Sequence, residues 1–270
     1  MSLNSKKLSN KIRSHVLDMT HNGKSSHIAS ILSIVDIISV LYENILIYKN
    51  KNPKYRKRDR FVLSKGHAGA AVYAVLAEKG FFNINMLKKH CANGSFLSGH
   101  ISHKNVPGVE FSTGSLGHGL SVACGMAKYA KLEKKNHRVY TLLSDGECDE
   151  GSNWESILFA SHHKLDNLVV IIDYNKLQSI ESVSNTLELE PFTKKWIAFG
   201  WEVHNVDGHN HHELKKVLEK SNKKKKPKCI IAHTVKGKGV SFMENNNLWH
   251  YRSPQGEEYQ MAKKELNKKN

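Results

Sequence analysis

The stretch that decides the fold runs from Ser144 to Gln178 and reads SDGECDEGSNWESILFASHHKLDNLVVIIDYNKLQ. It follows residues 139–143, a short β-branched and apolar run of the kind that forms a buried strand. The apolar residues after this strand have a helical spacing and fall at Trp154, Ile157, Leu158 and Leu165. A second buried strand over 168–172 then ends at Asp173-Tyr174-Asn175. The stretch therefore predicts a strand–helix–strand unit.

One polar residue closes each of the two predicted strands. Asp145 follows the first strand, and Asn175 comes just after the second. Because parallel crossovers are right-handed, these strand ends lie on the same edge of the sheet, where open α/β folds bind ligands. Carboxylate and amide oxygens suit Mg²⁺, which takes its other ligands from water and substrate phosphates. The alternative is an ordinary strand–helix–strand unit in which Asp145 and Asn175 only cap and turn the chain.

Helices and strands alternate along the rest of the chain. We expect helices over 8–22, 121–130, 191–199 and 211–220, and one long buried helix over 28–48. Short strands are expected at 61–63, 201–206 and 229–235, and a flexible turn at 236–240. No repeat and no linker interrupts this pattern, so residues 1–270 are predicted to form a single α/β domain.

Composition limits the classes of function. A net charge of +16 would suit nucleic acid, an anionic surface or anionic small substrates. The basic residues collect at 51–60, at 223–226 and after 263 without a nucleic-acid-binding pattern, so we interpret most of them as solvated surface. The four isolated cysteines argue against a zinc site and a disulfide framework and indicate a reducing compartment. Since neither a signal peptide nor a membrane span is evident, we expect a cytoplasmic protein.

Several histidines and one glycine-rich block are candidates for ligand binding. His27 precedes the long helix, and His67 lies in the segment LSKGHA between a strand and a small-residue helix, whose open amides suit an anion. Gly99-His100 and the block FSTGSLGHGL over 111–120 follow, and glycines there let backbone approach a ligand. On these residues alone, His27 is more often a cap or packing residue, His67 suits either role, and glycine-rich loops often only make turns.

Five separated segments occur in an order that one family shares. They are Leu63 to His67, Thr113 to Gly119, Asp145-Gly146 with Glu150-Gly151, Asp173 to Lys176, and Asn247 to His250. The third and fourth resemble the thiamine-diphosphate motif, and the complete pattern resembles the transketolase family over nearly the whole chain. Departures occur at Ser144, His118 and Tyr251, where relatives usually carry Gly, Gln and Gly.

The resemblance implies a fold, cofactors and site residues. The fold is a doubly wound, mostly parallel sheet with helices on both faces, the diphosphate-binding (PP) domain of thiamine-diphosphate enzymes. Mg²⁺ would be bound by Asp145, Asn175 and the backbone carbonyl of Leu177. Thiamine diphosphate would contact His67, Gly114, Ser115, Leu116, Gly146, Glu150, Asn175 and His250. His27, His100 and His250 would stabilise substrate oxygens and move protons, tasks that suit a histidine pKa near neutrality.

Two features have competing interpretations. The counterpart of Glu150 in relatives helps to organise the subunit contact beside the cofactor, but an acid near a helix N-terminus is favourable by itself. His209, His211 and His212 suggest a metal site. The segment from Trp201 to His209 nevertheless recurs in transketolases as structure, so we expect a structural role for it.

The implied activity is the transfer of a two-carbon ketol unit from a ketose to an aldose, with a sugar or sugar phosphate as substrate. Transketolases resemble this chain over their first domain only, and a second, pyrimidine-binding domain supplies the glutamate that activates the cofactor. We therefore expect the N-terminal subunit of a split transketolase, which needs a separate C-terminal subunit in an α₂β₂ heterotetramer. The alternatives are a subunit of a 2-oxo acid dehydrogenase or deoxyxylulose-phosphate synthase, a basic nucleic-acid-binding module, and a non-catalytic partner that kept the fold.

Overall fold

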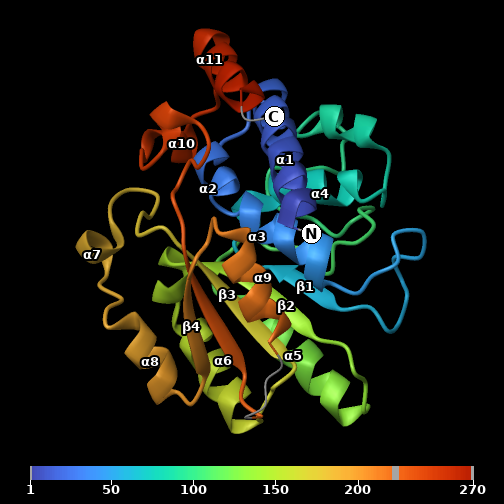
Figure 1. Ribbon diagram of the computed structural model, residues 1–270, viewed down its shortest axis with the longest axis vertical. Coiled ribbons are helices and arrows are strands. Elements are labelled where there is room, and N and C mark those ends of the chain that lie inside the picture. Colours follow the sequence, from blue (N-terminus) through green and yellow to red (C-terminus); the bar gives the residue numbers. More distant parts are fainter. Residues whose placement is uncertain (1, 221–224, 269–270) are drawn as a thin grey trace.

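A five-stranded parallel sheet forms the centre of the computed structural model, which describes residues 2–220 and 225–268 (Figure 1). The strands are β1 (Arg60–Leu63), β2 (Val139–Ser144), β3 (Leu168–Tyr174), β4 (Glu202–Asp207) and β5 (Lys228–His233). Their order across the sheet is β1-β2-β3-β5-β4. Every position of β2 and β3 is buried, as expected for parallel strands with helices on both faces.

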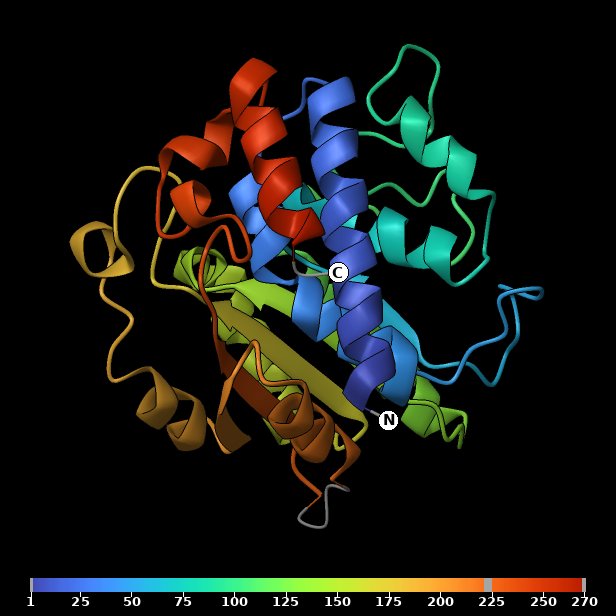
Figure 2. The same ribbon diagram turned by 45° about the horizontal axis from the view of Figure 1, so that its top comes forward.

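Alternate residues along each strand supply two separate cores. In β2, Tyr140 and Leu142 join one core, whereas Val139 and Leu143 join the other. The first core is covered by α1 (Ser2–Asn22), α3 (Val35–Val40), α4 (Gly69–Glu78) and α9 (His211–Glu219). The second is covered by α5 (Gly119–Leu132), α6 (Gly151–His162) and α8 (Phe192–Ala198) (Figures 1 and 2). The predicted doubly wound α/β fold is confirmed.

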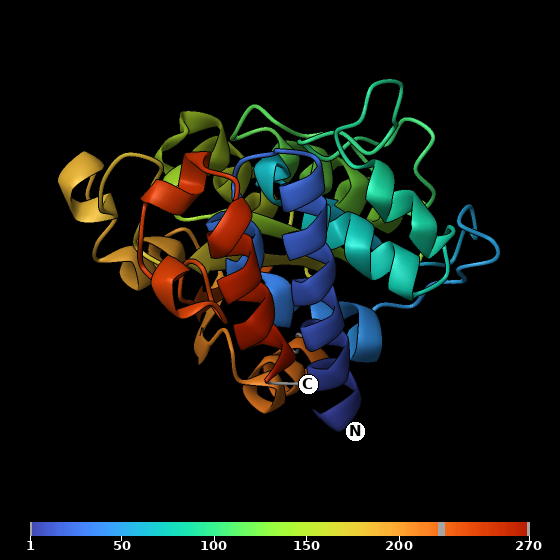
Figure 3. The same cartoon turned by 90° about the horizontal axis from the view of Figure 1, so that it is seen from above.

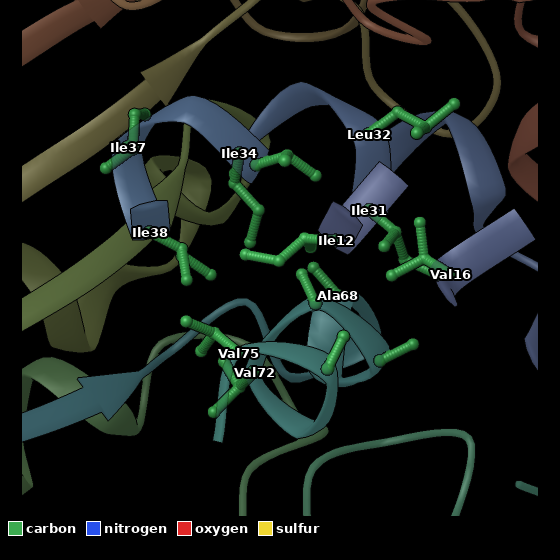
Figure 4. Packing of buried hydrophobic residues seen from close by; sticks show 14 of the residues in the cluster. Ile12, Val16, Ile31, Leu32, Ile34, Ile37, Ile38, Ala68, Val72 and Val75 are labelled. Atoms are coloured by element: carbon green, nitrogen blue, oxygen red, sulfur yellow. The ribbon is translucent and has the colours of Figure 1, made fainter. Parts of the chain in front are cut away.

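Helix α1 is the main packing element of the first core. Ile12 of α1 lies between Ile34 and Ala68, and all three side chains are fully buried (Figure 4). At the other end of α1, the ring of His21 stacks on Tyr259 of α11 (Gly256–Asn267) with 3.8 Å between centroids. The first and last helices therefore lie side by side (Figure 3).

The predicted long helix over 28–48 is broken. It consists of α2 (Ile28–Ser33), α3, and a π-helical turn η1 (Leu41–Ile45). At the first break the backbone angles of Ile34 are φ −96° and ψ −1°. A regular α-helix has φ of about −63° and ψ of about −42°. Beside it, the Ser33 hydroxyl donates to Asp173 Oδ1 at 2.6 Å. The apolar residues continue through 28–48 without Gly or Pro. The sequence therefore contains no local signal of the break or of the contact beside it.

The apolar spacing predicted for the helix after β2 is only partly realised. Ile157 is buried, but Leu158 is 60% exposed and Leu165 follows the end of α6 at His162. Buried Leu165 instead packs in the turn that leads into β3. Three- and four-residue spacing thus placed the helix but not all of its buried positions.

The remaining elements are short. They are η2 (Gly66–Ala68), η3 (Ile84–Lys89), η4 (Gly146–Asp149), α7 (Val183–Thr186), η5 (Ser241–Met243) and α10 (Leu248–Tyr251). Within the described ranges, no helix is both long enough and apolar enough to cross a membrane. Lys223 and Lys224 of the predicted basic loop, and the last two residues of the basic tail, lie outside the described residues.

Candidate functional site

The carboxyl ends of β2 and β3 lie side by side at one edge of the sheet. The two strands pair to their ends, and the Asp145 N–H donates to the Asp173 carbonyl at 3.2 Å. The Asp145 carboxylate is buried and accepts hydrogen bonds from the N–H groups of Gly146 at 2.8 Å and Lys176 at 2.6 Å. It therefore reaches across to the turn after β3, so Asp145 and Asn175 lie on the same edge, as predicted.

The turn after β3 supplies further oxygen atoms. Asn175 Oδ1 accepts from the Leu177 N–H at 3.1 Å, and Asn175 Nδ2 donates to Asp173 Oδ2 at 3.2 Å. The Leu177 carbonyl accepts from Lys236 Nζ at 3.2 Å. In the described part of the chain, no group of three or more His, Cys, Asp or Glu residues could hold a metal ion. A carboxylate, an amide and a backbone carbonyl fit Mg²⁺, which keeps other positions for water and phosphate.

Burial makes the Asp145 carboxylate costly to ionise. Burial raises the pKa of Asp145 to about 7, and the Asp173 carboxylate adds to the effect. Burial also acts to raise the pKa of Asp173, but Lys65 Nζ at 2.5 Å and the Ser33 hydroxyl outweigh it and lower that pKa. The Asp173 carboxylate thus has the ammonium of Lys65 in contact with it. The described residues instead provide Asp145 with hydrogen bonds from backbone N–H groups. A divalent ion beside Asp145 would supply the missing positive charge.

Two buried lysines are site residues that sequence reasoning missed. Lys65 pairs with Asp173 and donates to the Ser30 carbonyl at 3.3 Å. Lys236, 1% exposed, donates to the Gln178 carbonyl at 2.7 Å and to Asn247 Oδ1 at 3.1 Å. Burial, and then the charge of Lys65, lowers the pKa of Lys236 to about 8. The predicted turn at 236–240 is present over residues 236–239, and Lys236 ties it to the loop after β3.

Glu147 is a third residue that the sequence did not single out. Its side chain is fully buried, and Oε1 accepts hydrogen bonds from the Ser64 hydroxyl and from the Gly117 N–H at 2.9 Å. Oε2 accepts from the Ser144 N–H at 3.3 Å. Glu147 therefore joins the ends of β1 and β2 to the glycine-rich block. Among the several acids of 145–150, no pattern distinguishes the one that is buried.

Four histidines from separate segments meet beside this edge. The ring centroid of His27 lies 5.0 Å from that of His250, 5.2 Å from that of His67 and 5.6 Å from that of His100. His27 has a left-handed φ of 75°, and its N–H donates to the His250 carbonyl at 2.8 Å. The structure thus brings together the histidines that the resemblance assigned to substrate and cofactor.

Three histidines of this cluster, one buried and two partly buried, are neutral. Burial lowers the pKa of His27 to about 4, with His100 adding to the shift, and lowers the pKa of His250 to about 3, with Lys236 adding to it. Burial likewise holds the pKa of His67 well below its usual value. The expectation of a pKa near neutrality is therefore wrong for His27 and His250, because sequence gives no measure of burial. At neutral pH each ring offers one N–H donor and one acceptor nitrogen.

Comparison with known families decides what kind of domain this is. The family model described as transketolase, thiamine diphosphate binding domain, matches residues 4–269. The chain belongs to this family. The resemblance drawn from the five separated segments is thereby confirmed, and with it the thiamine diphosphate-binding character of the domain.

Transketolase relatives of similar length are named as subunits. The chain is 40% identical over 262 residues to a subunit of apulose-4-phosphate transketolase from Phocaeicola vulgatus, covering 97% of this chain and 93% of the relative. It is 38% identical over 260 residues to a subunit of 6-deoxy-6-sulfo-D-fructose transketolase from a Clostridium species, covering 96% and 94%. These names favour transketolase over the other thiamine enzymes and over a nucleic-acid-binding module.

Other transketolases are matched over part of their length. Human transketolase is 41% identical over 246 residues, which are 91% of this chain and 39% of the human protein. The solved transketolase of Campylobacter jejuni superposes with a TM-score of 0.91 at 32% identity, covering 98% of this chain and 43% of the other. The chain thus spans less than half of these transketolases.

Glycines in the transketolase domain let three segments approach closely. Gly117 has φ +84°, and a Cβ there would stand 2.6 Å from Ser152 Oγ and 2.7 Å from Glu150 Cβ. At Gly119 a Cβ would stand 2.4 Å from Ser64 Oγ. These two glycines are therefore required by packing. The contact at Gly117 also shows that the exposed Glu150 lies beside the glycine-rich block.

The residues predicted to border the cofactor lie on the open side of the same block. Ser115 is exposed, and Gly114 and Leu116 are partly so. A Cβ at Gly114 would stand 3.5 Å from the His100 ring, an ordinary contact distance. Packing within the chain therefore does not require glycine at this position.

We expect Gly117→Ala to lower the free energy of unfolding by about 1–3 kcal/mol, because alanine disfavours positive φ and its methyl group meets Glu150 and Ser152. The matched change Gly125→Ala lies on α5 in open space. It should raise the free energy of unfolding by up to about 1 kcal/mol, since alanine is the better helix former. Urea denaturation of both variants checks this, and equal effects would refute the packing role of Gly117.

The depressed histidine pKa values predict a loss of stability in acid. The unfolded chain takes up protons near pH 6.5, whereas folded His27 and His250 stay neutral down to about pH 4 and about pH 3. The stability that they contribute is therefore present above pH 6.5 and is lost as the pH falls toward 4. Urea titrations between pH 7 and 4 should show a shallower loss for His250→Asn than for the wild type. The change His162→Asn, at an exposed position, is the control, and parallel curves for all three proteins would contradict the interpretation.

The histidines after β4 form a structural network. His209 Nδ1 lies 2.8 Å from Asp36 Oδ2, and His211 Nε2 lies 3.0 Å from Asp36 Oδ1. Arg13 completes the network with Nη2 at 2.6 Å from Asp36 Oδ2. These contacts provide partners for a buried carboxylate, as expected for a structural role.

Proposed function

We propose that this chain is the diphosphate-binding subunit of a two-chain transketolase that transfers a two-carbon ketol unit from a ketose to an aldose. The observation that carries the proposal is the meeting of Asp145, Asn175 and the Leu177 carbonyl with four histidines at one sheet edge of a thiamine diphosphate-binding domain. The relatives that the chain matches over 93–94% of their length are named transketolase subunits.

The oxygen donors at the edge would hold Mg²⁺ and the cofactor. Asp145, Asn175 and the Leu177 carbonyl would bind the ion, and His67 and Gly146 would contact the diphosphate. Gly114, Ser115 and Leu116 would border the ring system, with Glu150 at the adjoining subunit contact. When bound, thiamine diphosphate supplies a site that stabilises a carbanion next to a carbonyl. Lys236, whose ammonium is placed at this edge by hydrogen bonds to the Leu177 and Gln178 carbonyls, would compensate phosphate charge.

The histidines would bind the sugar through hydrogen bonds to its oxygens. Ser26 Oγ lies 2.9 Å from His27 Nδ1, and Ser30 Oγ lies 3.3 Å from His250 Nδ1. Because the serines engage Nδ1, Nε2 is the atom that we assign to substrate oxygens in both rings. A neutral imidazole with a low pKa holds a hydrogen bond to a sugar hydroxyl without carrying charge into the site. His100, which is exposed, would bind the end of the sugar nearer to solvent.

The proposal includes a partner and a compartment. A separate pyrimidine-binding subunit would complete the cofactor site in an α₂β₂ heterotetramer, and the names of the relatives of similar length, which call them subunits, support such an arrangement. The four cysteines are all free thiols, which fits the reducing cytoplasm that we propose.

The test compares the purified chain with the same chain mixed with a separately produced pyrimidine-binding chain. With thiamine diphosphate and Mg²⁺ present, we expect no ketol transfer by the chain alone and transfer by the mixture. A coupled assay with ketose donors measures this, and pyruvate as donor separates transketolase from the 2-oxo acid enzymes. Full turnover by the chain alone would overturn the two-chain proposal.

A further inference from the structure

A basic cavity lies at the end of the sheet where β1 and β2 begin. Its volume is about 360 Å³, which falls in the range of small-molecule sites. Its lining residues come from the loop before β1 and the start of β1, the second half of α5 and the segment before β2. Three of the six lining side chains carry a fixed positive charge, and none of the six is acidic. The lining residues are Arg56, Arg60, Met126, Tyr129, Lys135 and His137.

The ring of His137 forms part of the cavity wall. His137 is 6% exposed, and its Nδ1 has no hydrogen-bond partner among the described residues. Other atoms of the His137 ring line the cavity, so a ligand bound there would lie against this ring. Burial lowers the pKa of His137, and the positive charge of Arg60 adds to the shift. A negatively charged ligand would offset both effects.

Two of the cationic side chains, those of Arg60 and Lys135, make their short contacts with uncharged groups. Arg60 donates to the carbonyls of Asp59 and Arg56, and its Nε lies 3.9 Å from a carboxylate oxygen of Glu110. Lys135 Nζ donates to the Tyr129 hydroxyl at 2.8 Å and lies 4.3 Å from the centre of that ring. The short contacts neutralise no charge, because carbonyls and a phenol are uncharged.

Two acids near the cavity are already engaged elsewhere. Asp59 accepts from the N–H groups of Ile47 at 2.9 Å and Arg138 at 2.8 Å. Glu110 pairs with Arg58 through both carboxylate oxygens. Among the described residues, no carboxylate forms an ion pair with Arg56 or Lys135, and Arg60 has only the longer contact of 3.9 Å to Glu110.

We propose that this cavity binds a phosphate group, either inorganic phosphate or the phosphomonoester of a small metabolite, at a site separate from the catalytic edge. Arg56 and Arg60 present planar guanidinium groups that match phosphate oxygens, and Lys135 adds a point charge. The site lies at the amino ends of the strands, whereas Asp145 lies at the carboxyl ends. It is thus independent of the proposed transketolase chemistry.

The test is a calorimetric titration of the full chain with inorganic phosphate and, separately, with ribose 5-phosphate. We expect saturable binding at one site, and Arg56→Ala and Lys135→Ala should each weaken it about tenfold by removing one charged contact. Lys57→Ala is the matched control, because Lys57 is an exposed basic residue of the same loop that does not line the cavity. Binding of both probes identifies a phosphomonoester site, and binding of phosphate alone identifies a site for the free ion.

A second control separates this cavity from the diphosphate end of the catalytic site. His67→Ala should leave phosphate binding unchanged, and the ring signals of His137 should shift during a titration followed by NMR. The proposal is overturned if no saturable binding occurs, if Lys57→Ala weakens binding as much as Arg56→Ala and Lys135→Ala, or if His67→Ala alone abolishes binding.

Discussion

Asp145→Asn should weaken the Mg²⁺-dependent binding of thiamine diphosphate at least about 100-fold. Removing a partner that only orients a metal ligand costs about 10–100-fold, and loss of a charged ligand itself should cost more. The asparagine keeps the size of the side chain and an oxygen that can accept the Lys176 N–H, but it carries no charge for the ion. Calorimetric titration of the assembled enzyme with cofactor and Mg²⁺ measures the change.

The fold of this variant can be checked separately from its binding. The neutral amide relieves the cost of burying a charge, but its NH2 cannot accept the second backbone N–H, so we expect only a small change in the melting temperature of the cofactor-free chain. Asp166→Asn, at a surface pair with Lys131, is the control and should bind the cofactor normally. Normal affinity in Asp145→Asn would remove this residue from the metal site.

Lys65→Met should lower the free energy of unfolding by about 3–5 kcal/mol, because it leaves the Asp173 carboxylate buried without its cation. The two side chains are 1% and 0% exposed, and Lys65 Nζ lies 2.5 Å from Asp173 Oδ2. Urea denaturation of the cofactor-free chain measures the loss.

A double variant shows whether the ion pair itself causes this loss. Lys65→Met with Asp173→Asn removes both charges and should recover a large part of the stability lost in the single variant. Lys131→Met breaks the partly exposed pair with Asp166 and should cost less than about 1 kcal/mol. Equal losses for Lys65→Met and Lys131→Met would show that Lys65 has no special role.

The fold and the sheet edge could be predicted from the sequence because the information is local. The buried strands 139–143 and 168–172 are marked by β-branched runs, and right-handed crossover brings their ends together. These two features alone predict that Asp145 and Asn175 lie on one edge of the sheet. The histidine cluster depended on the family resemblance, since nothing local distinguishes His27 or His67 from a capping residue.

The residues that sequence reasoning missed acquire their roles through tertiary contacts. Lys65 and Lys236 look like ordinary surface lysines in glycine-rich segments, yet both are buried at the sheet edge. Glu147 is one of several acidic residues in its segment. Its hydrogen bonds with Ser64 and Gly117 form only in the folded chain. Burial of this kind also explains why the histidine pKa values differ from expectation.

The break in the long predicted helix has the same kind of origin. It occurs at Ile34, beside the hydrogen bond from Ser33 to Asp173, which lies 140 residues away along the chain. Apolar spacing reports which face of a helix is buried, but it carries no information about a partner so distant in sequence.

The most direct test of the metal site is a crystal structure of the assembled enzyme with thiamine diphosphate and Mn²⁺ in place of Mg²⁺, using the anomalous signal of manganese. We predict one peak bonded to Asp145 Oδ, Asn175 Oδ1 and the Leu177 carbonyl. A manganese peak elsewhere, or a cofactor bound without contact to these three oxygens, would contradict the account.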